Sequence, residues 1–112
     1  FECGGCVYNC PGCTCFTVSD RSASAESGAR FRLWDTCMFK GFTRTAGGFV
    51  PAEQKLRRTK RWYHHKLVHW PAQFGAFGCV GCGRCAISCP GKIDMATVAL
   101  RIKEPERAVE KS

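Results

Sequence analysis

The sequence lacks an apolar run of the roughly 20 residues that a membrane-spanning helix needs. It also shows no positively charged leader followed by an apolar stretch and a cleavage site, the pattern of a secreted precursor. At 112 residues it has the length of one domain, and a hydrophobic core alone would leave so small a domain marginally stable. We therefore expect a single soluble or peripheral domain, residues 1–112, that bound metal groups help to hold together.

Cysteine, in contrast, is abundant, with 10 residues in the chain. In a short secreted protein this content would suggest a disulfide framework. All but one of the cysteines, however, fall in two tight groups, at residues 3–15 and 79–89, and Cys37 stands between them. Metal ligands cluster in this way, so we expect a reducing, oxygen-poor cytoplasm rather than an oxidising compartment.

The second group follows the spacing C-x2-C-x2-C-x3-C-P, with Cys79, Cys82, Cys85 and Cys89 directly before Pro90. In proteins with two 4Fe-4S clusters, the first three thiolates of such a run bind one cluster and the fourth binds the other. Glycines at 81 and 83 suit a backbone that takes positive φ and brings its N–H groups close to sulfur. A zinc knuckle or a disulfide framework is the weaker alternative, because zinc sites separate two C-x2-C pairs by a long gap.

The first group repeats this spacing from its second cysteine onward, with Cys3, Cys6 and Cys10 before Pro11. The missing first cysteine would fall immediately before Phe1, so we expect the chain to be a fragment of a longer subunit. The alternative is that the absent ligand is one of the three remaining cysteines, Cys13, Cys15 and Cys37.

Two such motifs exchange their last cysteines. Cluster one would be bound by Cys3, Cys6, Cys89 and the unseen cysteine, and cluster two by Cys79, Cys82, Cys85 and Cys10. This exchange ties the two ends of the chain together, so cluster loading and folding should be one event. No catalytic centre is expected in the chain itself.

Acidic residues are few, with 9 Asp and Glu against 17 Lys and Arg and a formal charge of +8. Such a charge favours nucleic-acid binding at first sight. Each oxidised 4Fe-4S site with four thiolates carries about −2, so the loaded domain would be nearer roughly +4. A nucleic-acid-binding module whose fold is stabilised by bound metal is therefore only a minor alternative.

Residues 19–78 form a long insertion between the two motif regions, 1–18 and 79–112. We expect an extended segment at 16–18, a loop at 19–28, and a half-buried strand at 29–34 that points Phe31 and Leu33 inward. With the helices below, the predicted fold class is mainly α with short β segments.

A basic helix is predicted at about residues 51–68, closed by Trp70 and Pro71. Pro51 suits its first position and Glu53 its first turn, where the helix dipole favours negative charge. Its apolar stripe is expected to consist of Ala52, Leu56, Tyr63 and Leu67. The Lys and Arg residues on its other faces indicate either a solvated surface or docking to an acidic partner or an anionic cofactor.

A second helix is expected at residues 95–102, because Asp94 suits its N-cap and Val98 with Ile102 forms an apolar pair. The charged stretch from Lys103, which contains Pro105, is expected to be a frayed end or to lead into further sequence.

The three cysteines outside the two motifs have several interpretations. Cys37 suits either a buried small apolar residue or a ligand or partner of Cys13 or Cys15. The three together are also a candidate redox or sulfur-handling site.

Several stretches narrow the assignment: Cys10-Pro-Gly-Cys-Thr-Cys-Phe, Trp34-Asp-Thr-Cys37, Ala46-Gly-Gly, His65-Lys-Leu, and the second cysteine motif with Gly91-Lys-Ile-Asp94. Together they resemble the dicluster iron-sulfur subunit of sulfhydrogenases, the beta subunit of NAD(P)-linked nickel-iron hydrogenases. They are similar as well to the dicluster iron-sulfur subunit of anaerobic sulfite reductase.

The resemblance implies an alpha-helical-ferredoxin-like module at the C-terminal part of a larger subunit. It also implies an electron relay between a flavoprotein partner, which holds FAD and binds NAD(P), and a catalytic subunit that reduces protons, sulfur species or sulfite. The alternative is a free-standing dicluster ferredoxin, although such carriers are usually compact and acidic.

Overall fold

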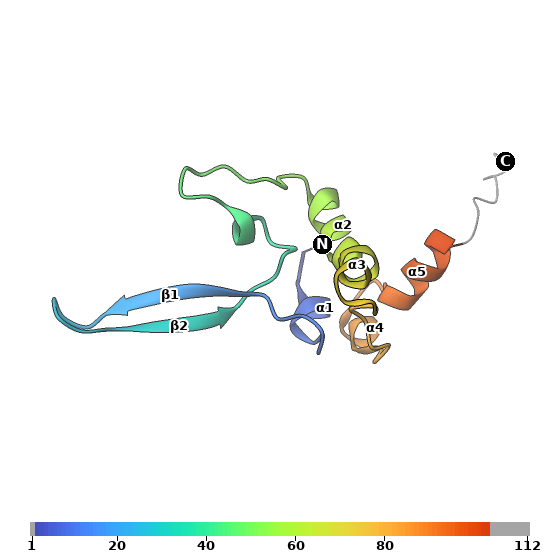
Figure 1. Ribbon diagram of the computed structural model, residues 1–112, viewed down its shortest axis with the longest axis horizontal. Coiled ribbons are helices and arrows are strands. Elements are labelled where there is room, and N and C mark those ends of the chain that lie inside the picture. Colours follow the sequence, from blue (N-terminus) through green and yellow to red (C-terminus); the bar gives the residue numbers. More distant parts are fainter. Residues whose placement is uncertain (1, 104–112) are drawn as a thin grey trace.

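The computed structural model describes residues 2–103. The protein measures 67 × 30 × 29 Å along its principal axes. A long β-hairpin projects at one end, and the helices gather toward the other (Figure 1). None of the helices in the described range has both the length and the apolar character that spanning a membrane requires.

The hairpin consists of two antiparallel strands, β1 (Phe16–Ser22) and β2 (Gly28–Trp34). β1 is longer than expected and takes up residues 19–22 of the loop predicted at 19–28, so that loop is confirmed only at residues 23–27. An exposed ion pair between Arg30 and Asp20 at 2.7 Å links the two strands. Cross-strand pairs of this kind stabilise a sheet locally, which extends the pairing toward the tip.

Both faces of the hairpin are open to solvent. The expectation that Phe31 and Leu33 point inward is wrong, since they are 44% and 50% exposed. A two-stranded sheet has no second layer to cover either face, so the alternation of polar and apolar residues along β2 buries nothing. The hairpin therefore presents apolar side chains that the described chain leaves uncovered.

The central helix is unbroken but changes its winding. It consists of α2 (Lys55–His64), the π-helical turn η2 (His65–His69) and α3 (Trp70–Phe74), and both junctions keep right-handed helical angles. The helix predicted at 51–68 thus begins later and runs further than expected. Pro71, which has no N–H to donate to the preceding turn, does not end the helix, because it is the second residue of α3 and the wider π turn ends at His69, two residues earlier.

Arg58 explains the late start of α2. Its buried guanidinium donates to the carbonyl oxygens of Ala52 and Glu53 and, through Nε, to that of Met38 at 3.0 Å. Backbone held by these contacts does not wind into a helix, and Gln54 still has extended angles, with ψ at 135°. Pro51 is therefore not the first helical residue.

Glu53 likewise lies outside the first turn of α2. Its carboxylate pairs with Lys40 at 2.7 Å, at the start of the 3-10 helix η1 (Lys40–Thr43). This contact ties the segment before the central helix to the segment that follows the hairpin.

Each cysteine motif contains one short helix, α1 (Gly5–Tyr8) in the first and α4 (Arg84–Ser88) in the second. α5 (Met95–Lys103) follows the second motif. The expected cap of this helix is confirmed, because Asp94 accepts a hydrogen bond from the Thr97 backbone N–H at 2.7 Å. Phe1 and the charged tail at 104–112 lie outside the described residues.

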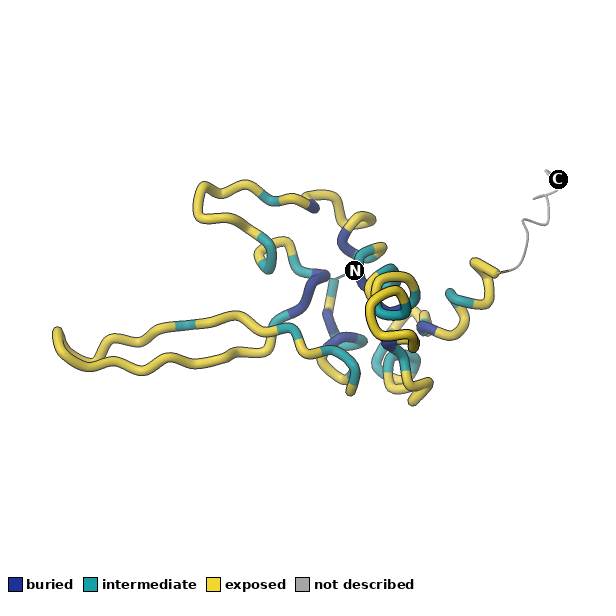
Figure 2. The backbone as a smooth tube through the Cα atoms, viewed as in Figure 1, coloured by how far each residue is buried: buried dark blue, intermediate teal, exposed yellow. Residues whose placement is uncertain are grey.

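The hydrophobic core is small and consists of Val7, Cys37, Met38, Trp62 and Met95. Figure 2 shows that buried residues occur where the motif loops, the segment after the hairpin and the central helix meet. Thr36, Arg58 and Lys66 are buried there as well. With so small a core, we expect bound metal groups to supply much of the stability.

Arg58→Met should destabilise the domain, because carbonyl groups of three residues and the paired Glu2 carboxylate would lose their partner. The expected loss in the free energy of unfolding is about 3 kcal/mol, the cost of leaving buried polar groups unsatisfied. Urea unfolding of the anaerobically purified protein, followed by far-UV circular dichroism, measures this loss. Arg57→Met, at an exposed position of the same helix, is the control and should stay within about 0.5 kcal/mol of wild type. Equal losses in the two variants would contradict the role given to Arg58.

Candidate metal centres

The two cysteine motifs fold alike. In each, the glycine that follows a cysteine takes a left-handed φ, 72° at Gly4 and 75° at Gly83, and begins the short helix that carries the next cysteine. Glycine takes this angle without strain. The last cysteine of each motif then donates its backbone N–H to a carbonyl oxygen of that helix. Cys10 donates to Val7 and Cys89 donates to Cys85, each with an N···O distance of 3.1 Å. The repeat seen in the sequence is therefore a repeat in structure.

The two motif helices pack against each other through equivalent positions. Asn9 and Ser88 both stand directly before the last cysteine of their motif, and Asn9 Nδ2 donates to Ser88 Oγ at 2.9 Å. Contact between equivalent positions is what an approximate two-fold axis produces. As a result, each last cysteine comes to lie beside the cysteines of the other motif.

Three cysteines line the first cavity, which has a volume of about 400 Å³. Cys3 and Cys6 come from the first motif and Cys89 from the second. Its other walls include Met38, Thr59, Trp62, Tyr63 and Ile93. None of the three cysteines outside the motifs lines this cavity.

Four cysteines line the second cavity: Cys10, Cys79, Cys82 and Cys85. Cys10 is the contribution of the first motif. This cavity is closed by Trp62, Lys66 and Met95 and is narrow, about 20 Å³. Cys82 and Gly83, which also line this cavity, are exposed on their other side.

Both sets of sulfurs suit 4Fe-4S clusters better than single ions. Within residues 2–103, no three His, Cys, Asp or Glu side chains converge closely enough to hold one metal ion. The thiolates of a cubane cluster bind different iron atoms, so they surround the cluster without converging on one point. The donor chemistry of both cavities therefore fits the clusters, with three cysteines present at the first and four at the second.

The sulfurs that line the first cavity affect the pKa values of Cys6 and Tyr63. Burial raises the pKa of the Cys6 thiol to about 11, and the neighbouring sulfurs of Cys3 and Cys89 add to this effect. Tyr63 lies beside the same sulfurs. Its burial is the main cause that raises its pKa to about 12, and the nearby cysteines add to this effect. Because a thiol must lose its proton to bind iron, loading of this site is coupled to proton release.

Two side chains of the central helix reach the sulfurs of Cys10 and Cys13. Lys66 Nζ donates to the Gly78 carbonyl oxygen at 2.7 Å; burial would lower its pKa, but the nearby sulfurs of Cys13 and Cys10 outweigh burial and raise it. Trp62 Nε1 donates to Cys13 Sγ at 3.4 Å. The central helix thus supplies the polar contacts around the last cysteine of the first motif.

These contacts favour a thiolate at Cys10. Burial alone would raise the pKa of this thiol, but hydrogen bonds from the Gly12 backbone N–H and from Lys66 outweigh burial and lower that pKa. The thiolate is the form that binds iron, so the site is prepared for its ligand role.

The buried face of the central helix differs from the predicted apolar stripe. Leu56, expected on that stripe, is 77% exposed, whereas Arg58, Trp62 and Lys66 are buried. These three residues are spaced four apart, which places them on one face of a helix. That spacing is the signal in the sequence that could have identified them.

Of the three cysteines outside the motifs, Cys13 and Cys15 pack against the core cluster that contains Cys37, and none of the three lines either cavity. Cys37 is buried in the core. This burial is the main cause that raises its pKa to about 11, and the neighbouring Cys15 and Cys13 add to the effect. A thiol with this pKa stays protonated at neutral pH and packs as a small apolar group.

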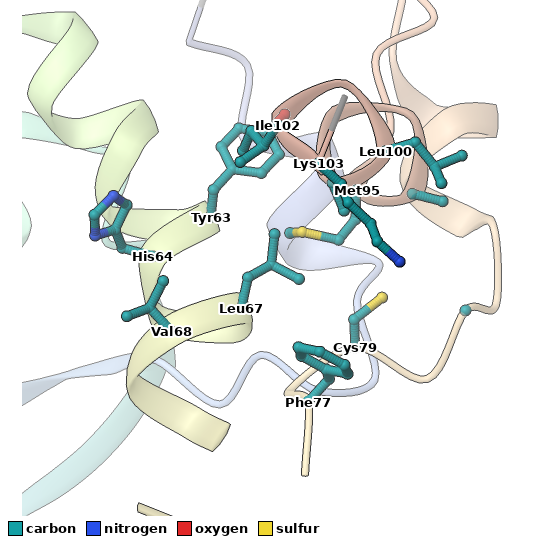
Figure 3. Close-up of a pocket in the computed structure, with 13 residues that line it drawn as sticks. Tyr63, His64, Leu67, Val68, Phe77, Cys79, Met95, Leu100, Ile102 and Lys103 are labelled. Carbon is teal, nitrogen blue, oxygen red and sulfur yellow. The ribbon is translucent and has the colours of Figure 1, made fainter. Parts of the chain in front are cut away.

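An apolar groove of about 560 Å³ runs between the central helix and α5. Figure 3 shows Cys79 at its edge, with Leu67 and Phe77 close by. Cys79 and Met95 line both this groove and the second cavity, so an apolar, open surface lies next to that cavity.

The 4Fe-4S dicluster domain family matches residues 1–93 of the chain. The sulfhydrogenase 2 subunit beta of Pyrococcus furiosus is 34% identical over 102 residues, which cover 91% of this chain and 30% of that subunit. The chain thus spans about a third of the length of this curated relative. No solved structure matches it.

These matches confirm the resemblance to the sulfhydrogenase beta subunit that the cysteine motifs and the stretches between them suggested. They agree with the two cavities, each lined by cysteines from both motifs. The chain belongs to the 4Fe-4S dicluster domain family and is an iron-sulfur electron-transfer chain related to a sulfhydrogenase beta subunit.

Proposed function

We propose that the chain relays electrons between a partner that binds a flavin and NAD(P) and a catalytic subunit of the hydrogenase, sulfur reductase or sulfite reductase type. The observation that carries the proposal is that cysteines of both motifs meet in each of two cavities. We assign Cys3, Cys6 and Cys89 to cluster one and Cys10, Cys79, Cys82 and Cys85 to cluster two, in an alpha-helical-ferredoxin-like arrangement.

The part played by the chain is to hold two sites side by side and to shield them. Each cluster, when bound, supplies one-electron exchange. Trp62 lines both cavities, so one side chain stands between the two sites. Met38 and Met95 add apolar walls on either side, and solvent exposure is one of the factors that set a cluster's potential.

The amount of exposed surface favours a subunit over a free carrier. The chain exposes 8913 Å², against about 6,100 Å² for a compact monomer of this mass. Large apolar side chains contribute to it, among them Trp34, Phe49 and Phe77, each at least 66% exposed. Exposed apolar side chains of this size support the presence of faces that another protein covers. The related protein is itself the beta subunit of a sulfhydrogenase.

Paired substitutions test which cysteines share a cluster. Cys10→Ala with Cys82→Ala should leave about half of the iron and sulfide, because both residues are assigned to cluster two. Cys10→Ala with Cys6→Ala should remove both clusters. Iron and sulfide analysis of anaerobically purified protein distinguishes the two results.

The control is Cys37→Ala, a cysteine substitution outside both cavities, which should keep the full iron content. The exchange of cysteines would be refuted if the pair at 6 and 10 kept half of the iron and the pair at 10 and 82 kept none.

The assignment to a larger oxidoreductase is tested by purification from the native source without oxygen. The chain should copurify with a flavoprotein, and NAD(P)H should reduce its clusters through that partner, as followed by the loss of visible absorbance. Recovery as an active soluble monomer would support a free-standing ferredoxin instead. Retention of the loaded protein on nucleic acid at physiological salt would support the nucleic-acid-binding alternative.

A further inference from the structure

Lys66 belongs to neither cysteine motif, yet it lines the second cavity. The residue is 2% exposed, and its Nζ donates to the Gly78 carbonyl oxygen at 2.7 Å. Cys10 lines the same narrow cavity, and a Cβ placed on Gly12 would lie 3.1 Å from Lys66 Nζ and 3.9 Å from Cys10 Sγ. A buried cation thus lies directly beside a cysteine assigned to cluster two.

Two glycines make room for Lys66, Gly12 beside its ammonium and Gly78 beside its backbone. A Cβ added at Gly12 would stand 3.1 Å from Lys66 Nζ and 2.9 Å from the Gly78 carbonyl oxygen. A Cβ added at Gly78 would stand 3.2 Å from the Cα of Lys66. Contacts this short would force the lysine or the backbone to move, so the chain is shaped to keep the ammonium in this place.

The first cavity has no counterpart to Lys66. Its walls are formed by cysteines, glycines and apolar, aromatic or hydroxyl side chains, and no Lys or Arg among residues 2–103 lines it. The approximate two-fold symmetry of the motifs therefore does not extend to the charge around them. One site has a buried cation and the other has none among its lining residues.

We propose that Lys66 raises the reduction potential of cluster two above that of cluster one, so that an electron entering the domain rests on cluster two. The inference rests on the proposed assignment of Cys10 to cluster two. Reduction adds one negative charge to a cluster, and a positive charge close by in a poorly solvated site stabilises that charge strongly. Hydrogen bonds to the ligand sulfur act in the same direction.

Redox titration of the loaded protein, monitored by electron paramagnetic resonance, tests the inference. The midpoint potential that disappears in the variant with Cys10→Ala and Cys82→Ala identifies cluster two. Lys66→Gln removes the charge but keeps an N–H group that can bind the Gly78 carbonyl. This variant should lower the potential of cluster two and leave that of cluster one in place.

The expected size is about a tenfold change in the equilibrium constant for electron exchange between the clusters, which is 59 mV for a one-electron couple. Lys66→Arg keeps the charge and should stay near the wild-type potential. Lys60→Gln, at an exposed position of α2, is the matched control and should change neither potential.

The order of the two wild-type potentials is a second test, which holds even if Lys66→Gln fails to load its clusters. A higher potential at cluster one, or equal shifts of both potentials in Lys66→Gln, would overturn the inference while leaving the relay intact. Iron analysis separates this outcome from failure of the proposed function, because a wild-type protein with fewer than two clusters would overturn the relay itself.

Discussion

The packing of α1 against α4 is the constraint on which the rest of the structure depends. Two copies of one short motif meet through equivalent residues, with Asn9 bonded to Ser88. This contact brings the first and the last third of the chain together and places Cys10 and Cys89 each beside the opposite motif. The insertion between the motifs is thereby closed into a loop, and its hairpin can project into solvent because the core does not depend on it.

The central helix supplies what the paired motifs lack. Arg58 fixes the segment before the helix, Trp62 separates the two cavities, and Lys66 enters the second one. All three lie on one helical face, and two of them are cations. A domain with so few buried apolar side chains thus uses charged residues, each satisfied by carbonyl or sulfur groups, to connect its segments.

Features that depend on neighbouring residues could be predicted from the sequence, whereas features that depend on contacts between distant segments could not. The spacing of Cys79 to Cys89 reflects the short reach of a loop around a cluster, and Asp94 caps a helix through residues next to it. Burial of Arg58 and Lys66 depends on carbonyl and sulfur groups from distant segments, so their positive charge suggested a solvated face instead. In β2, alternation predicted burial of Phe31, but alternation leads to burial only where a second layer covers the sheet.

The exchange of cysteines between the two motifs is the central claim, and an anaerobic crystal structure of the loaded protein, with iron located by anomalous scattering, tests it most directly. We predict that Cys10 Sγ is bonded to the cluster held by Cys79, Cys82 and Cys85. A bond from Cys10 to the cluster that holds Cys3 and Cys6, or Cys13 in the place of Cys10, would contradict it.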